Sequence, residues 1–118
     1  MSAVPKLGAF ITARNGRIDG DGVSLKRVFR RTKRGLRSLA VYVELGELLT
    51  GHRLKVEVRV VDDEDQLIWE SIASDELVRY RERELLFQLD GMALKLGSVA
   101  VELHVNGILL DVRRLSLE

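Results

Sequence analysis

The sequence predicts an all-β protein, a single-domain antiparallel β-sandwich of seven to eight strands with little helix over residues 1–118. Three observations lead to this fold class. Apolar and polar side chains alternate with a period of two in most segments, and turn-forming residues recur about every 8–12 positions. A chain of 118 residues with 46% hydrophobic composition can also bury one core of its own. A small β-barrel built from the same strands is the alternative.

The clearest strand is expected at residues 53–62. Four apolar side chains alternate there with four charged ones, in the order RLKVEVRV. A period of two places the apolar set on one face of a strand and the charged set on the other. The acidic run 62–65 then forms a turn. We expect the apolar face of this strand at the centre of a sandwich and its charged face in water.

Seven further segments are interpreted as strands, in chain order 6–13, 23–32, 39–45, 66–74, 85–89, 99–105 and 108–117. The first is expected to place Leu7, Ala9 and Ile11 on one face and to stop where turn-forming residues occupy 14–22. The alternation slips within 23–32, as it does at a bulge or an edge strand. Segment 66–74 carries apolar side chains on both faces, so both are expected to be partly covered.

Two connections differ in how strongly the sequence determines them. Asn106-Gly107 lies between two alternating runs and predicts a tight hairpin, because a type I′ turn needs positive φ at both central residues. In segment 74–83, Ser74 can cap a helix, but the apolar spacing of a helix fails after Tyr80. Loop, helix and strand all stay open for this segment.

Four stretches carry a resemblance to a known group of proteins: 15–31, VYVEL at 41–45, GHRLKVEVRVVD at 51–62, and 97–107. They resemble a family of uncharacterised small bacterial β-sandwich proteins, in which the phrases G-H-x-hydrophobic-x-V-x-hydrophobic-V-D and G-x-Y-x-F-x-hydrophobic-x-V-x-G recur. Val99 stands where that family more often has an aromatic residue. The resemblance implies an immunoglobulin-like or C2-like sandwich of unknown function, and it transfers no catalytic residue.

Composition excludes several classes of protein. The chain has no cysteine, so disulfides, zinc thiolate sites and cysteine nucleophiles are absent. No apolar run approaches a signal sequence or a membrane span, and we expect a soluble, cytoplasmic protein. The net charge of +1 hides an asymmetry: residues 1–43 hold ten Lys and Arg against two acids, and residues 44–118 hold nine against sixteen. Either an anionic partner or pairing between the two halves accounts for this asymmetry.

The densest charge cluster has seven cations in twelve residues and no acid: Lys26, Arg27, Arg30, Arg31, Lys33, Arg34 and Arg37. We call it the basic segment. It suits an anionic ligand, because arginine binds phosphate oxygens in pairs. The alternative interpretation, with no ligand, is a solvated edge strand whose charges block aggregation. Nucleic acid is not favoured but stays open, because few aromatic side chains are interleaved with the cations.

The arginine spacing in the basic segment offers a sharper version of the anionic-ligand hypothesis. Arg30 and Arg34, or Arg27 and Arg31, are four positions apart and resemble the arginine motif of the PilZ domain. The resemblance implies a small β-barrel that binds cyclic diguanylate. The second PilZ motif, Asp/Asn-x-Ser-x-x-Gly, is missing: the nearest counterpart, residues 44–51, lacks both the acid or amide and the serine.

Other chemistry is poorly supported. Asp19, Asp21 and the acidic run 62–65 suit a hard cation if two loops converge, although such residues more often serve plain turns. Neither His52 nor His104 lies in a nucleophile-elbow context, and no glycine-rich loop leads from a strand into a helix. We therefore expect no catalytic residue, no cofactor and no metal.

The sequence thus predicts a non-enzymatic binding or assembly module that acts in protein–protein interaction, self-association as an oligomer included. The alternative is binding of an anionic ligand, a cyclic dinucleotide or nucleic acid, through the basic segment. The partner, the oligomeric state and the strand order do not follow from the sequence.

Overall fold

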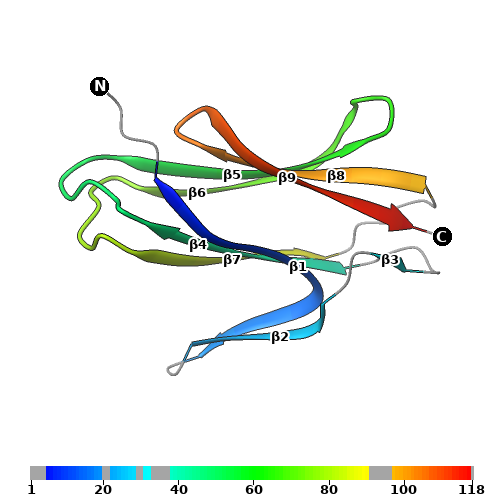
Figure 1. Ribbon diagram of the computed structural model, residues 1–118, viewed down its shortest axis with the longest axis horizontal. Helices are drawn as coiled ribbons and strands as arrows, with labels where there is room; N and C mark the ends of the chain where they lie inside the picture. Colours follow the sequence, from blue (N-terminus) through cyan, green and yellow to red (C-terminus); the bar gives the residue numbers. More distant parts are fainter. Residues whose placement is uncertain (1–4, 20–21, 29–30, 33–37, 91–96, 118) are drawn as a thin grey trace.

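The structure is a computed structural model that describes residues 5–19, 22–28, 31–32, 38–90 and 97–117 (Figure 1). These residues form strands and loops and no helix. The strands are β1 (Lys6–Asp19), β2 (Gly22–Val28), β3 (Arg31–Thr32), β4 (Ser38–Gly46), β5 (Leu54–Asp62), β6 (Leu67–Asp75), β7 (Arg83–Asp90), β8 (Gly97–Val105) and β9 (Ile108–Leu117). Seven of them have eight residues or more, while β2 has seven and β3 only two.

The strands lie in two sheets packed face to face. One has the order β2-β1-β4-β7 and the other β3-β9-β8-β5-β6. All pairs are antiparallel except the short pair β3–β9. The central part, β1-β4-β7 against β9-β8-β5-β6, matches the immunoglobulin order A-B-E against G-F-C-C′. The predicted sandwich is confirmed as immunoglobulin-like, and the described ladders do not close into the alternative barrel.

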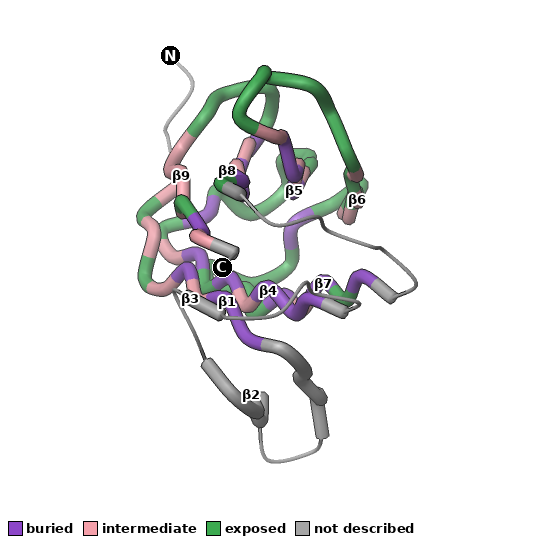
Figure 2. Tube along the Cα trace, turned by 90° about the vertical axis from the view of Figure 1, so that its right-hand side faces the viewer, coloured by how far each residue is buried: buried purple, intermediate pink, exposed green. Residues whose placement is uncertain are grey.

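The core lies between the sheets and is made by the period-two strands. In β5, Leu54, Val56, Val58 and Val60 are all buried, as expected from their alternation. The facing sheet contributes buried side chains from β4 and β7, and Figure 2 shows this buried zone in purple between the layers. Because both layers alternate inward apolar and outward polar residues, the core needs no metal or disulfide to be continuous.

The first strand begins at Lys6 as expected but is longer than expected. It was expected to stop near Arg14, but β1 continues to Asp19 and pairs with β2 from Ala13↔Val28 to Asp19↔Gly22. The segment 23–32, interpreted as one strand, is divided between β2 and β3, which lie in different sheets. Turn-forming residues were overridden here because cross-strand pairing, a tertiary effect, outweighs local propensity.

The inward face of β1 also differs from expectation. Leu7, Ala9 and Ile11 were assigned to one face, yet Phe10, Thr12 and Ala13 are buried while Leu7, Ala9 and Ile11 are half-buried. The reason is an irregularity between Leu7 and Ala9 in the pairing with β4, which shifts the alternation by one residue.

The structure defines the two connections discussed above, the turn at residues 106–107 and the segment after β6. Asn106 and Gly107 have φ of 50° and 81°, which confirms the predicted tight turn. Residues 76–82 form a loop, not a helix or strand. This β6–β7 loop is held against residues 48–52 by Val78 N to His52 O (2.8 Å), Gly51 N to Val78 O (2.8 Å) and Leu48 N to Arg81 O (2.9 Å). In the part of the chain described, no helix is long and apolar enough to span a membrane.

Candidate binding surface

The basic segment is placed at sheet edges. Lys26 and Arg27 belong to β2, the last strand of one sheet, and Arg31 belongs to β3, the last strand of the other. Arg30, Lys33, Arg34 and Arg37 lie outside the described residues. The described cations of the segment therefore lie on edge strands of both sheets, while its role in binding an anion stays a prediction.

The acidic turn after β5 uses its first carboxylate for turn chemistry. Asp62 Oδ1 accepts hydrogen bonds from the backbone N–H groups of Glu64 and Gln66, each at 2.9 Å. Asp65 has a positive φ of 58° and donates its N–H to the Asp62 carbonyl at 3.2 Å. These contacts make the three-residue hairpin loop in which a type I turn is followed by a residue in the left-handed region. Among the described residues, no three His, Asp or Glu side chains gather as a metal site would require.

The two histidines lie apart. His52 is exposed in the β4–β5 connection, and His104 lies on the outward face of β8 with its Nε2 3.0 Å from Glu102 Oε1. A catalytic triad would need a serine beside one of these imidazoles; among the serines with a described side chain, Ser71 lies on β6 and Ser98 lies on β8. Ser71 and Ser98 have no hydrogen bond to either imidazole, so this part of the chain shows no triad.

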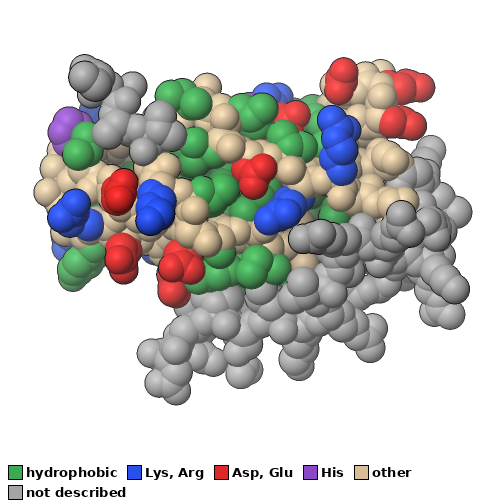
Figure 3. Space-filling view, in the orientation of Figure 1, with side chains coloured by type: hydrophobic (Ala, Val, Ile, Leu, Met, Phe, Trp, Pro, Cys, Tyr) green, Lys and Arg blue, Asp and Glu red, His purple; other side chains and the backbone are tan. Residues whose placement is uncertain are grey.

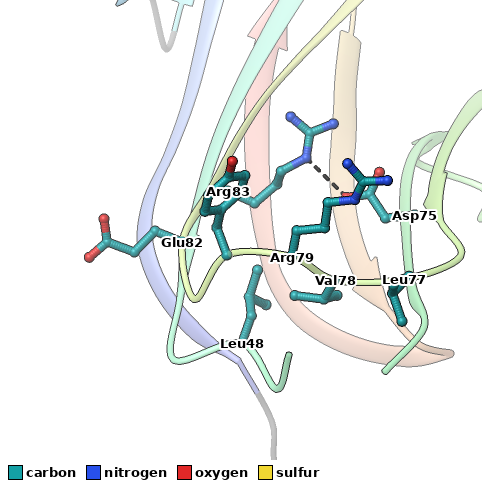
Figure 4. Close-up of a pocket in the computed structure, with 8 residues that line it drawn as sticks. Leu48, Asp75, Leu77, Val78, Arg79, Glu82 and Arg83 are labelled. Atoms are coloured by element: carbon teal, nitrogen blue, oxygen red, sulfur yellow. Dashed lines mark hydrogen bonds and ion pairs between the residues drawn. The ribbon is translucent and has the colours of Figure 1, made fainter. Parts of the chain in front are cut away.

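A cavity of about 270 Å³ lies where the β6–β7 loop folds back onto the end of the sandwich. It is lined by Leu48, Asp75, Leu77, Val78, Arg79, Tyr80, Glu82 and Arg83 (Figure 4). Leu48 and Val78 are buried, whereas Leu77 and Tyr80 are 56% and 77% exposed. Most of this lining comes from one loop, so the cavity depends on the backbone bonds that tie the loop to residues 48–52.

The polar wall of the cavity is an ion pair between opposite sheets. Arg83, at the start of β7, donates from Nε to Asp75 Oδ2 at the end of β6, at 3.0 Å. Figure 4 shows the Arg79 guanidinium on the same side as this pair, while the Glu82 carboxylate points away. The cavity thus has an apolar floor and a charged wall that holds two arginines and two acids.

Exposed apolar side chains concentrate along β6 and the β6–β7 loop, and two of them line this cavity. Of the eight large hydrophobic residues exposed in the described part of the chain, five fall within residues 67–80: Leu67, Ile68, Ile72, Leu77 and Tyr80. We call these five the apolar edge. Three of them belong to β6, the last strand of its sheet, whose ladder partner is β5. Exposed apolar groups gathered on an edge strand are typical of an interaction surface.

The opposite side of the sandwich is closed more fully. There Arg113 of β9 donates from Nε to the Phe10 carbonyl of β1 at 3.1 Å, and its guanidinium carbon lies 5.9 Å from the Phe10 ring centroid. The face shown in Figure 3 mixes acidic, basic and hydrophobic side chains, and its described part has no large patch of one charge sign.

Comparison with known proteins gives a similarity to solved structures but no match in sequence. No protein-family model matches this chain, and no curated protein sequence matches it. A solved structure of an immunoglobulin-like protein from Pseudomonas aeruginosa is similar with a TM-score of 0.43 and 11% identity, covering 99% of this chain and 94% of the other. The chain is an immunoglobulin-like β-sandwich domain, the class that its own strand order defines.

Sequence reasoning did not single out the apolar edge or the cavity as a site. A signal for the apolar edge was present, because segment 66–74 has apolar residues on both faces, which an edge strand with one wet face does not need. The cavity had no such signal, since Leu48 and Val78 are brought together by loop hydrogen bonds across thirty positions of sequence.

Proposed function

We propose that this protein is a non-enzymatic binding module that recognises a protein partner along β6 and the β6–β7 loop. The observation that carries this proposal is the apolar edge. Five exposed large hydrophobic side chains within residues 67–80 leave apolar surface in water, and covering it by a partner is favourable by about 25 cal/mol per Å².

The surroundings of the apolar edge support a protein partner over a small apolar ligand. Ile68 and Ile72 alternate along an extended strand with Glu70, and the loop adds Leu77 and Tyr80 next to Arg79. A mixed surface of this kind, with an aromatic and an arginine among aliphatic groups, resembles the centre of protein–protein interfaces. The shallow, partly charged cavity then serves as one pocket of a larger contact.

The experiment compares immobilised wild-type protein with two variants in a lysate of its native cells. Replacing Leu77→Ser and Tyr80→Ser together removes the exposed loop side chains without touching the buried floor. Gln88→Ser, on the neighbouring edge strand β7, is the matched control because Gln88 is also exposed. We expect the wild type and the control to retain the same protein, and the double variant to retain at least tenfold less. Equal retention by all three contradicts the proposal.

A second candidate function is anionic-ligand binding by the basic segment. Its supporting observation is seven cations in twelve residues, of which Lys26, Arg27 and Arg31 belong to edge strands. Calorimetric titration with an oligonucleotide and a cyclic dinucleotide, at low and physiological salt, tests it. A salt-sensitive isotherm that Arg27→Ala with Arg31→Ala weakens is expected; a flat response at low salt contradicts it.

A further inference from the structure

We propose that the partner on β6 is a second copy of this chain, paired antiparallel through β6 about a twofold axis at Ser71. The two five-stranded sheets then join into one continuous sheet. This inference rests on the proposed binding function and names its occupant. It follows from the free edge of β6, from its register and from its charges.

Within the described residues, no further strand pairs with the outer edge of β6. The strand has nine residues, LIWESIASD, with no lysine or proline, two residues with which natural edge strands block pairing with another chain. Its ladder with β5 is irregular at one end, where Val60 and Val61 pair with Trp69 and Leu67. In the described part of the chain, β5 is the strand that pairs with β6, and the loop hydrogen bonds between residues 48–52 and 76–82 lie beyond its end. Alternate N–H and C=O groups of β6 are thus available to a further strand.

The register of a twofold pairing is selected by the sequence of β6. An axis at Ser71, the fifth of nine residues, centres the overlap on the strand, with regular pairing from Trp69 to Ala73 and the irregularity of β6 at its Leu67 end. It places Glu70 opposite the partner's Ile72 and Trp69 opposite the partner's Ala73. An axis at Glu70 would instead set two carboxylates directly opposite, which is destabilising. The longest overlap therefore coincides with a register that avoids like charges.

The two acids of β6 are already compensated inside the chain. Glu70 Oε2 lies 3.7 Å from Arg59 Nε on β5, and Asp75 Oδ2 lies 3.0 Å from Arg83 Nε on β7. A second copy brings the same compensated charges, so strand pairing adds no net repulsion at the contact. This balance distinguishes β6 from a strand that repels its own copy.

Side chains on both faces of β6 would be covered by this pairing. On the outward face, Ile72 is 49% exposed and lies diagonal to the partner's Ile72, within reach of an aliphatic contact. On the inward face, Trp69 packs against the core yet stays half-buried. The partner's Ala73 would extend the surface on which its ring rests. The contact is isologous, so it closes as a dimer.

A single introduced thiol tests the register. The chain has no cysteine, so Ser71→Cys provides one thiol on the proposed axis. Residues directly opposite in an antiparallel pair have Cα atoms about 4.5–5.5 Å apart, within disulfide range. Ser74→Cys is the matched control on the same strand, because its two copies lie far apart in this register. Under mild oxidation we expect a disulfide dimer from Ser71→Cys and at least tenfold less from Ser74→Cys.

Sedimentation velocity over a concentration series supplies the second readout. Ile72→Glu sets carboxylates opposite each other in both halves of the contact, and we expect it to weaken dimerisation at least tenfold. Gln88→Glu on β7 is expected to leave dimerisation unchanged. A wild type that is monomeric at every concentration, or equal cross-linking at positions 71 and 74, overturns the inference. If Ser71→Cys cross-links another protein and not its own copy, self-pairing is wrong while the binding function stands.

Discussion

Strands β6 and β7 are the edge strands of the two sheets on one side of the sandwich, yet their surfaces differ (Figure 2). In β7 the inward Leu85, Phe87 and Leu89 are buried and the outward Glu84 and Gln88 are polar. In β6 the inward side chains are half-buried, and the outward strip includes two exposed isoleucines. The apolar side chains of β7 are thus buried within the chain, whereas β6 leaves apolar surface exposed for a partner.

The difference follows from how the two strands contribute to the core. The inward row of β7 faces the apolar rows of the opposite sheet and is sealed by them. The inward row of β6 is Trp69, Ser71 and Ala73, of which Ser71 adds no apolar surface. Removing inward side chains from the two strands should therefore have unequal effects.

The largest expected effect is on the inward aromatic of each strand. Phe87→Ala should lower the free energy of unfolding by about 3–5 kcal/mol, because Phe87 is 5% exposed and its removal leaves a cavity. Trp69→Ala should cost less than about 2 kcal/mol in the monomer, since the Trp69 ring is only partly buried. Urea unfolding of both variants measures this. Equal losses would remove the distinction between the two edges.

The next effect concerns the ion pair that joins the two strands. Arg83 and Asp75 have side chains 45% and 33% exposed, so their 3.0 Å contact should contribute less than about 1 kcal/mol. A double-mutant cycle with Arg83→Ala and Asp75→Ala measures the coupling, and added salt should reduce it. A coupling well above this value, unaffected by salt, would show that the edges are joined more rigidly than their exposure indicates.

A smaller effect is expected on the outward face of β7. Glu84 is directly opposite Glu44 of β4, and like charges in that position are destabilising. Glu84→Gln should raise the free energy of unfolding by about 0.5 kcal/mol. On β6, Glu70→Gln should bring no such gain, because Glu70 lies near Arg59 and not near another acid. Thermal unfolding at low salt compares the two variants, and a gain for Glu70→Gln alone would reverse the comparison.

The smallest effect is an alkaline transition beside β7. Burial, and then the charges of Glu44 and Glu84, raise the pKa of Tyr42 from 10.0 to about 12. Because the pKa of Tyr42 is raised in the folded state, the contribution of the neutral phenol to the free energy of unfolding is complete below pH 10. It is lost as the pH rises through about 12. Absorbance titration of the wild type should show a late phenolate step that Tyr42→Phe removes. If that step persists in the variant, the assignment to Tyr42 is wrong.

Much of the fold was predictable where local chemistry and tertiary structure agree. Strand 53–62 and the Asn106-Gly107 turn both follow from rules that act over a few residues: a period of two, and positive φ at two adjacent positions. The extension of β1 to Asp19 was not predictable in this way. Its residues favour turns, and pairing with β2 supplies the competing energy.

The candidate binding surfaces were also only partly predictable from the sequence. The basic segment was visible as a run of cations, but its role depends on where the side chains point, which sequence does not specify. The apolar edge was visible only as an excess of apolar residues in segment 66–74. Its meaning came from the strand order, which places β6 last in its sheet.

The sequence by itself determined that this is an all-β protein and favoured a sandwich over a barrel, because alternation with a period of two and frequent turns leave few other ways to bury 46% hydrophobic residues. Only the tertiary structure decided which strands are edges, which face of β1 is buried, and that residues 48 and 78 meet. The physical reason is that alternation acts between neighbours in the chain. Strand order and loop closure arise from contacts between residues distant in sequence.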